Sequence, residues 1–131
     1  MNEEQALKTI KKICESNEYI EICGFLGYDR SSDKYVVSQQ DNISEDPSKY
    51  FMIDPIDYLL FKDKCEMVAI YHSHIEGSEQ PSKFDIKMAE SCCDPFLIYS
   101  LETKKIHIYK PKNMDLDVSI LNRVKDCNDQ N

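Results

Sequence analysis

The chain has 131 residues, with 16 Lys and Arg against 24 Asp and Glu and a formal net charge of −8. This balance argues against sequence-independent nucleic-acid binding and against docking on an anionic membrane surface, because both require an excess of cationic side chains. A hydrophobic fraction of 41% with only three Gly and five Pro predicts one folded domain and excludes low-complexity classes.

Helical and strand patterns alternate along the first half of the chain. Apolar residues recur with helical spacing near the N-terminus, and two β-rich runs flank a polar turn over residues 29–33. Asp54 and Pro55 are residue types that favour an N-cap and a first helical position. The predicted elements are a helix over 3–16, strands over 19–28 and 34–38, an irregular stretch over 41–54, a helix over 56–62 and a strand over 67–74 that is buried on both faces.

The second half continues this alternation and completes one α/β domain of mixed (α+β) type. Its predicted elements are a helix over 82–92, strands over 96–101 and 105–109, and a weak helical pattern after Pro111 formed by Met114, Leu116, Val118, Leu121 and Val124. The polar end, residues 127–131, is expected to fray. We therefore predict a domain over residues 1–111, followed by a helical extension with a frayed tail over 112–131.

The six cysteines are predicted to be free thiols. The N-terminus lacks the apolar segment of a signal peptide, and no apolar run in the sequence is long enough to span a membrane. A reducing compartment is therefore expected, and with it a cytoplasmic location. No C-x-x-C pair is present, and Cys92 and Cys93 are adjacent, so most of the cysteines are interpreted as small buried hydrophobic residues.

A His-Ser-His tripeptide at residues 72–74 and the downstream Asp85 form a candidate metal site. Residues two apart in a strand face the same side, so both imidazoles are expected to continue the face of Val68 and Ile70. Asp85 can supply a third ligand if the following helix packs its first turn over the end of that strand. Two His, one carboxylate and an open position are the usual plan of a catalytic zinc site, although iron and manganese accept similar ligands.

A purely structural interpretation of the same residues competes with this one. Ser82-x-x-Asp85 is also typical of a helix N-terminus, in which Ser82 caps the helix and Asp85 bonds back to the cap. The two interpretations are compatible for Ser82, which can cap a helix and also present its hydroxyl to a site. Two of the three histidines lie in one tripeptide, which favours the metal site; His107 is expected to face solvent and is given no metal role.

Hydrolysis at a zinc site also needs a base that accepts a proton from water. The upstream candidates are Glu15, Glu18 and Glu21. Glu21 stands out because it interrupts the apolar run 19–26, where a carboxylate is costly unless it is paired or lies next to a cation. The alternative is that Glu21 occupies a solvent-facing strand position.

Together these motifs resemble those of the JAMM metallopeptidases, which are also called MPN or JAB-type domains. The likeness spans residues 5–111 and rests on Glu21-x-Cys23-Gly24-Phe25-Leu26, His72-Ser73-His74 and Pro81-Ser82-x-x-Asp85. The resemblance implies a curved mixed β-sheet flanked by helices, with one Zn²⁺ ion bound by His72, His74 and Asp85. It also implies that Glu21 deprotonates the attacking water and that Ser82 stabilises the oxyanion. No ligand position departs from the family pattern.

Within that family, the sequence is similar to the JAB domains of lambda-like phage tail assembly proteins K. The segments that carry this likeness are 40–47, 51–58 and 92–100. Proteins of that kind usually carry an NlpC-type cell-wall peptidase domain as well, and we expect any such domain on a separate chain. The likeness implies a phage-tail role, in the host cytoplasm or in association with the virion, with tail proteins or a separate cell-wall peptidase chain as partners.

We therefore expect a zinc-dependent metallopeptidase that hydrolyses a peptide or isopeptide bond in a protein or peptide substrate. Two alternatives stay open: an isopeptidase that acts on ubiquitin-like or sulfur-carrier protein tails, and a non-catalytic, zinc-bearing interaction module in tail assembly. The net negative charge predicts a substrate that is neutral or basic near the cleft, and no nucleic-acid or membrane partner.

Overall fold

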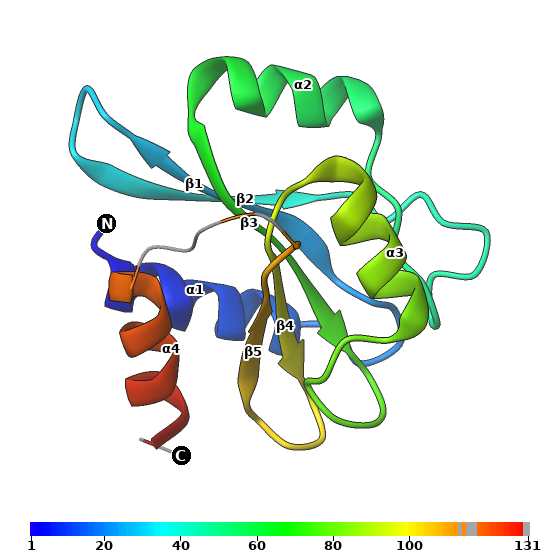
Figure 1. Cartoon of the computed structure of the whole chain (residues 1–131). Coiled ribbons are helices and arrows are strands. Elements are labelled where there is room, and N and C mark those ends of the chain that lie inside the picture. The colour runs from blue at the N-terminus through cyan, green and yellow to red at the C-terminus, as the bar shows by residue number, and fades with distance from the viewer. Residues whose placement is uncertain (113, 115–117, 130–131) are drawn as a thin grey trace.

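Helices cover both faces of a five-stranded mixed sheet (Figure 1). The computed structural model describes residues 1–112, 114 and 118–129. Within these residues the elements are, in chain order, α1 (Glu3–Glu15), β1 (Cys23–Asp29), β2 (Lys34–Gln40), α2 (Pro55–Lys64), β3 (Glu66–His74), α3 (Lys83–Cys92), β4 (Phe96–Ser100), β5 (Ile106–Tyr109) and α4 (Val118–Asp129). The predicted fold class is confirmed, and the helix after Asp54 and Pro55 begins as their residue types indicate.

The strands lie in the order β2-β1-β3-β4-β5. Neighbouring strands run antiparallel except for β3 and β4, which are parallel. A parallel pair needs a long crossover connection, and α3 provides it here. This crossover returns the chain across one face of the sheet and so places the start of α3 near the end of β3 (Figure 1).

Each face of the sheet has its own hydrophobic core. On one face α1 and α4 pack against the sheet, and the buried side chains there include Leu7, Ile10, Tyr71, Tyr99, Ile120 and Val124. On the other face lie α2 and α3, with a core built from Cys23, Phe25, Phe51, Phe61, Ile70, Ala89 and Phe96. The second core is rich in aromatic rings, and it borders the site described below.

The first strand starts later than the sequence predicts. The side chain of Asn17 accepts hydrogen bonds from the backbone N–H groups of Tyr19 (2.8 Å) and Ile20 (3.2 Å). This local bonding turns the chain after α1. Residues 19–22 therefore lie outside β1, and the prediction of a strand from residue 19 is wrong for these four. Glu21 belongs to the segment that leads into the sheet.

A β-bulge changes which side chains of β3 face each core. Leu26 pairs with Ala69 whereas the next residue, Gly27, pairs with Met67, so Val68 is the extra residue. Val68 consequently packs with the core under α1 and α4, while Ile70 belongs to the core under α2 and α3. The prediction that both residues share one face with the histidines is correct for Ile70 and wrong for Val68.

The C-terminal helix bonds to the edge of the sheet. The Asn128 amide donates to the carbonyl of Ile106 and accepts from its backbone N–H, both at 2.8 Å, which covers the outer edge of β5. The helix continues through Asp129, so residues 127–129 belong to α4, and their expected fraying stays a prediction. Leu116 and residues 130–131 of the predicted extension lie outside the described residues.

The structure also tests the cysteine and membrane predictions. All six cysteines are free, as predicted. Only Cys14 and Cys23 are buried, so the interpretation of most cysteines as buried hydrophobic residues is wrong for the other four. No helix in the described part of the chain combines the length and apolar character needed to cross a bilayer.

Candidate metal centre

The two histidines of the tripeptide lie at the C-terminal end of β3 and face the same side of the sheet. The His72 side chain is completely buried, and its ring stacks on Phe51 with centroids 4.3 Å apart. Phe96 packs edge-on against the same imidazole at 5.6 Å. His74 retains 13% side-chain exposure, so one edge of the pair is open to solvent.

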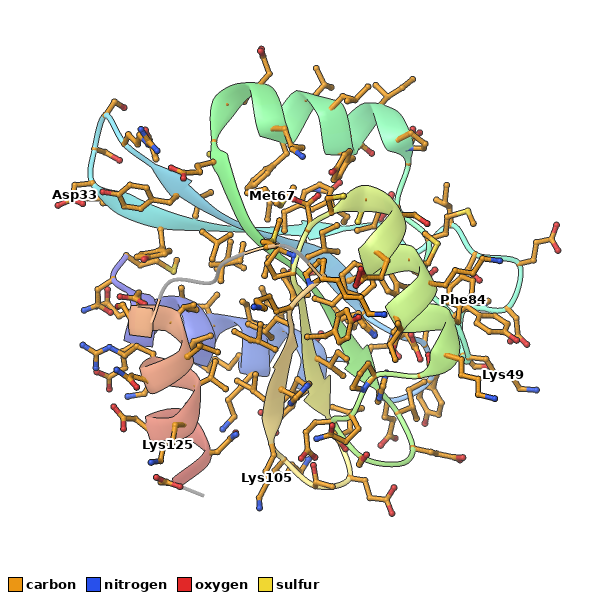
Figure 2. All side chains as sticks on the ribbon, in the orientation of Figure 1. Asp33, Lys49, Met67, Phe84, Lys105 and Lys125 are labelled. Atoms are coloured by element: carbon orange, nitrogen blue, oxygen red, sulfur yellow. The ribbon has the colours of Figure 1, made fainter. Side chains whose placement is uncertain are left out.

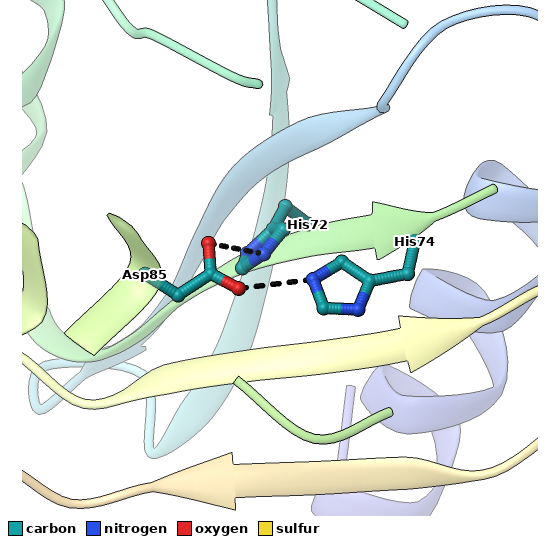
Figure 3. A group of neighbouring side chains, drawn as sticks. All are labelled: His72, His74 and Asp85. Carbon is teal, nitrogen blue, oxygen red and sulfur yellow. Dashed lines mark hydrogen bonds and ion pairs between the residues drawn. The ribbon is translucent and has the colours of Figure 1, made fainter. Parts of the chain in front are cut away.

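The N-terminus of α3 brings a carboxylate to this pair. Asp85 Oδ1 lies 3.1 Å from His72 Nε2, and Asp85 Oδ2 lies 2.9 Å from His74 Nε2 (Figure 3). The possible ligand atoms of the three residues all lie within 4.8 Å of one another. The structure therefore groups the three predicted metal ligands as one candidate metal centre.

Asp85 is held in position by the helix cap that the sequence also predicts. The backbone N–H of Asp85 donates to Ser82 Oγ, and the backbone N–H of Ser82 donates to Asp85 Oδ2, both at 3.0 Å. This capping box fixes the carboxylate at the first turn of α3. Ser82 and Asp85 can therefore cap α3 while the Asp85 carboxylate also faces the two histidines.

The donor set fits a zinc ion. Two imidazole nitrogens and one carboxylate oxygen are ligands that Zn²⁺ accepts, and with an open fourth position they match a catalytic site. His74 Nδ1 lies 2.8 Å from the carbonyl oxygen of Ser78, which stabilises the tautomer with the proton on Nδ1 and leaves Nε2 to bind an ion. Both ring nitrogens of His72 are buried without a hydrogen-bond partner of good geometry. A buried nitrogen without a partner lowers the stability of the folded chain, and an ion bound to Nε2 would offset part of this penalty.

The titration behaviour of the three groups follows from this proximity. Burial alone would raise the pKa of Asp85, but the imidazoles of His72 and His74 beside its carboxylate hold this pKa well below its ordinary value. Burial lowers the pKa of His72 below its ordinary value. Burial also acts to lower the pKa of His74, but its bonds to Asp85 and the Ser78 carbonyl outweigh this and raise it. An ionised Asp85 beside two imidazoles is the charge arrangement that a divalent cation requires.

Glu21 reaches this centre from the segment before β1. The backbone N–H of Ile22 donates to Ser73 Oγ and the N–H of Ser73 donates to the Ile22 carbonyl, both at 2.9 Å. Because Cys23 pairs with His72, the same antiparallel register brings Glu21 opposite His74. The Glu21 side chain is buried, not solvent-facing, and burial together with Asp85 raises its pKa to about 8 while His74 opposes this.

The irregular stretch 41–54 supports the site in a way that sequence reasoning missed. The Asn42 amide donates to the carbonyls of Glu21 and Tyr50, both at 2.9 Å, and its oxygen accepts from the N–H of Met52 at 3.2 Å. The backbone N–H of Glu21 donates to Pro47 at 2.7 Å. These bonds position Glu21 and also bring Phe51 over His72. An Asn in an irregular segment gives no sequence signal for this role.

Beside the centre lies an aromatic pair formed by the exposed Tyr50 and the half-buried Phe84. The ring centroids of Tyr50 and Phe84 lie 5.1 Å apart, so this contact joins the 41–54 stretch to the first turn of α3. Figure 2 shows Phe84 on that turn. Ser82 is also exposed on this turn. The structure thus places all five predicted site residues at one end of β3, whereas their chemical roles stay predictions.

This fold and the grouped His, His and Asp residues define a JAB-type domain. The chain belongs to the family of prokaryotic homologs of the JAB domain (Prok-JAB), whose model matches residues 3–115. Among curated proteins, the chain is similar to tail tip assembly protein K of Escherichia phage N15, with 28% identity over 92 residues. The aligned region is 70% of this chain but only 37% of that relative.

Solved structures share the fold. Protein DSY2949 from Desulfitobacterium hafniense superposes with a TM-score of 0.61 at 23% sequence identity, over 87% of this chain and 92% of that one. A protein from Salinibacter ruber superposes with a TM-score of 0.54 at 16% identity, over 86% of both chains. These two structures share the fold of this chain over most of its length.

Proposed function

We propose that this chain is a zinc-dependent metallopeptidase that hydrolyses a peptide or isopeptide bond and acts in phage tail assembly. The observation that carries the proposal is the buried Glu21 carboxylate opposite a grouped His72, His74 and Asp85. The similarity to a tail tip assembly protein supports the phage-tail setting. Tail proteins or a separate cell-wall peptidase chain are the proposed partners.

His72, His74 and Asp85 would hold the zinc ion. Bound there, zinc would supply Lewis-acid chemistry, which polarises a carbonyl and makes water more acidic. The Phe51 and Phe96 rings exclude water from the inner side of His72, so substrate reaches the site from the side of His74 and Ser82. A partly desolvated site of this kind strengthens electrostatic interactions with the substrate.

Glu21 acts as the proton carrier in this proposal. Its carboxylate accepts a proton from the attacking water, whose oxygen bonds to the carbonyl carbon, and the same proton passes to the amine as the C–N bond breaks. Without an ion at the site, burial raises the pKa of Glu21 to about 8, so this carboxylate accepts a proton more readily than an exposed one does. A neighbouring cation would favour the ionised form that starts the cycle.

Ser82 stabilises the negative charge that develops on the carbonyl oxygen. Its hydroxyl oxygen already accepts the N–H of Asp85, so the hydroxyl hydrogen is free to donate to an oxyanion. The exposure of Ser82 on the first turn of α3 makes this hydrogen accessible to substrate.

The Glu21→Gln variant tests the proposed reaction. We expect it to retain zinc in metal analysis after dialysis, because no zinc ligand is changed, and to lose hydrolysis. Substrates for the assay are tail proteins, linear peptides, and C-terminally extended ubiquitin-like and sulfur-carrier proteins. Turnover by this variant equal to that of the unmodified chain contradicts the role of Glu21. Full zinc occupancy without turnover of any substrate by the unmodified chain supports the non-catalytic interaction module instead.

A further inference from the structure

The carbonyl that bonds to the His74 ring lies in an exposed loop. Residues 75–80 follow β3, and residues 76–78 of this 75–80 loop are exposed. Core packing therefore contributes little to the position of Ser78, yet its carbonyl oxygen lies 2.8 Å from His74 Nδ1. Polar contacts from another part of the chain fix the loop instead, and they come from the end of β4 and the turn after it.

This part of the chain bonds to both backbone polar groups of Gly77. The Ser100 hydroxyl donates to the Gly77 carbonyl at 2.6 Å, and the Gly77 N–H donates to the Glu102 carboxylate at 2.5 Å. Thr103 adds a third contact, because its hydroxyl donates to the carboxylate of Glu79 at 2.7 Å. The loop and the turn lie at the same end of the sheet because β4 runs parallel to β3 (Figure 1).

Ser100 takes part in most of these contacts. It is the last residue of β4, pairs with His74 of β3 and is completely buried. Besides its bond to Gly77, its oxygen accepts the backbone N–H groups of Glu102 (3.1 Å) and Thr103 (3.0 Å). A serine hydroxyl has one donor and two acceptor sites, so its full bonding capacity is used here. Alanine at this position would remove all of these bonds at once.

We propose that Ser100 is a positioning residue for His74; the inference rests on the proposed function, because it gives Ser100 a role toward a zinc ligand. Through Gly77, Ser100 holds the Ser78 carbonyl where it accepts the Nδ1 hydrogen of His74. The ring is then fixed with Nε2 2.9 Å from Asp85 Oδ2 and directed toward the candidate metal centre. Loss of such a partner of a ligating histidine lowers metal affinity by roughly 10–100-fold.

Gly77 gives the 75–80 loop its turn and offers a second way to disturb it. Its φ of +84° lies in the left-handed region that favours glycine. A Cβ atom at this residue would meet no heavy atom of the described residues within 4 Å. Gly77→Ala therefore strains the backbone of the loop without a steric clash, and it leaves the Ser100 hydroxyl unchanged.

Hydrogen exchange at the His74 ring tests the inference without zinc. At about pH 5 both ring nitrogens carry hydrogen, and nitrogen-edited NMR of the metal-free chain follows exchange of the Nδ1 hydrogen with water. Ser100→Ala should speed this exchange by about threefold to tenfold, the factor that the loss of one hydrogen bond produces. Gly77→Ala should also speed it, because a strained loop opens more often. Ser100→Thr keeps a hydroxyl and should restore slow exchange.

Zinc affinity is the second measurement. In competition with a chromophoric chelator, Ser100→Ala should bind zinc at least ~10-fold more weakly than the unmodified chain, and Ser100→Thr should recover most of this loss. Asn128→Ala is the control, because it removes two hydrogen bonds to Ile106 at the edge of the sheet. It should lower stability without changing exchange at His74 or zinc affinity. Circular dichroism checks that every variant stays folded.

The possible outcomes separate this inference from the proposed function. Exchange in Ser100→Ala and Gly77→Ala as slow as in the unmodified chain, an equal increase in Asn128→Ala, or full zinc affinity in Ser100→Ala would each overturn the role of Ser100. None of these results would contradict the zinc site itself. A failure of the unmodified chain to bind zinc would instead overturn the proposed function, and the exchange rates would still decide whether Ser100 positions His74.

Discussion

Ser82 and Asp85 are joined by two hydrogen bonds of 3.0 Å, one in each direction between side chain and backbone. The same Asp85 carboxylate lies within 3.1 Å of both imidazoles. One residue pair therefore starts α3 and also orients the carboxylate toward the candidate metal centre. Substitutions can separate these two contributions.

Asp85→Asn should lose metal while largely preserving the helix. The Asn oxygen can still accept the N–H of Ser82, but the negative charge that offsets a cation is gone. Zinc affinity should fall by more than ~10-fold, since even the loss of an outer-shell partner of a ligand costs that much. Competition with a chromophoric chelator measures the change. Asp126→Asn, an exposed substitution on α4, is the control and should bind zinc like the unmodified chain.

Ser82→Ala should lower stability and leave zinc binding in place. Removal of the N-cap oxygen is expected to cost about 1 kcal/mol of unfolding free energy in urea titrations. Ser82→Asn should recover most of this loss, because Asn is also a good cap. Under the proposed mechanism neither variant hydrolyses substrate as well as the unmodified chain. Full activity in Ser82→Ala would argue against an oxyanion role.

The buried Glu21 should make the metal-free protein less stable as pH rises. Its pKa is raised from 4.5 to about 8 in the folded state, so between these values the unfolded chain ionises while the folded chain stays protonated. This contribution is fully present below pH 4.5, is lost as pH rises through 8, and has a slope of up to about 1.4 kcal/mol per pH unit. Urea titrations in EDTA should show that the unfolding free energy falls more steeply with pH in the unmodified chain than in Glu21→Gln, and the difference between the two proteins is the Glu21 contribution. Parallel pH profiles for the two proteins would contradict the burial of Glu21.

Gly27→Ala should disturb the contact between β1 and α2. A Cβ atom at residue 27 would lie 2.6 and 2.7 Å from ring carbons of Phe61. Overpacking of this kind is expected to cost about 1–3 kcal/mol of unfolding free energy. Phe61→Leu gives the new methyl group more room, so the double variant should be less destabilised than the sum of the two single variants. Strict additivity in urea titrations would show that the cost of Gly27→Ala does not come from contact with the Phe61 ring.

The sequence was sufficient to predict much of the candidate site. The same-face rule for alternate strand residues correctly places His72 and His74 together, and the spacing from Ser82 to Asp85 correctly predicts a cap. These predictions succeed because they depend on local geometry. The rule fails for Val68, because a bulge depends on the pairing of two strands and has no signature within one of them.

Long-range contacts limit prediction elsewhere. The apolar run around Glu21 indicates a strand, but the Asn17 turn and the bond to Pro47 hold this residue outside the sheet. Phe51 lies in a stretch without periodicity, so nothing in the sequence indicates that its ring covers His72. Asn128 bonds to Ile106 at the sheet edge although the two residues are 22 positions apart in the sequence. The polar composition of this end predicts fraying and gives no sign of that contact.

Asn42 bonds to Glu21, Tyr50 and Met52, so the stretch between residues 42 and 50 is tied at its two ends. Glu45 lies between these ends, is exposed and takes no part in these bonds. Replacement of the Glu45 side chain can therefore alter the outer surface of this stretch without displacing the Glu21 carboxylate or the ring over His72. Because the bonds of Asn42 stay in place when an exposed residue such as Glu45 changes, the same site could be directed to a different partner by a few substitutions.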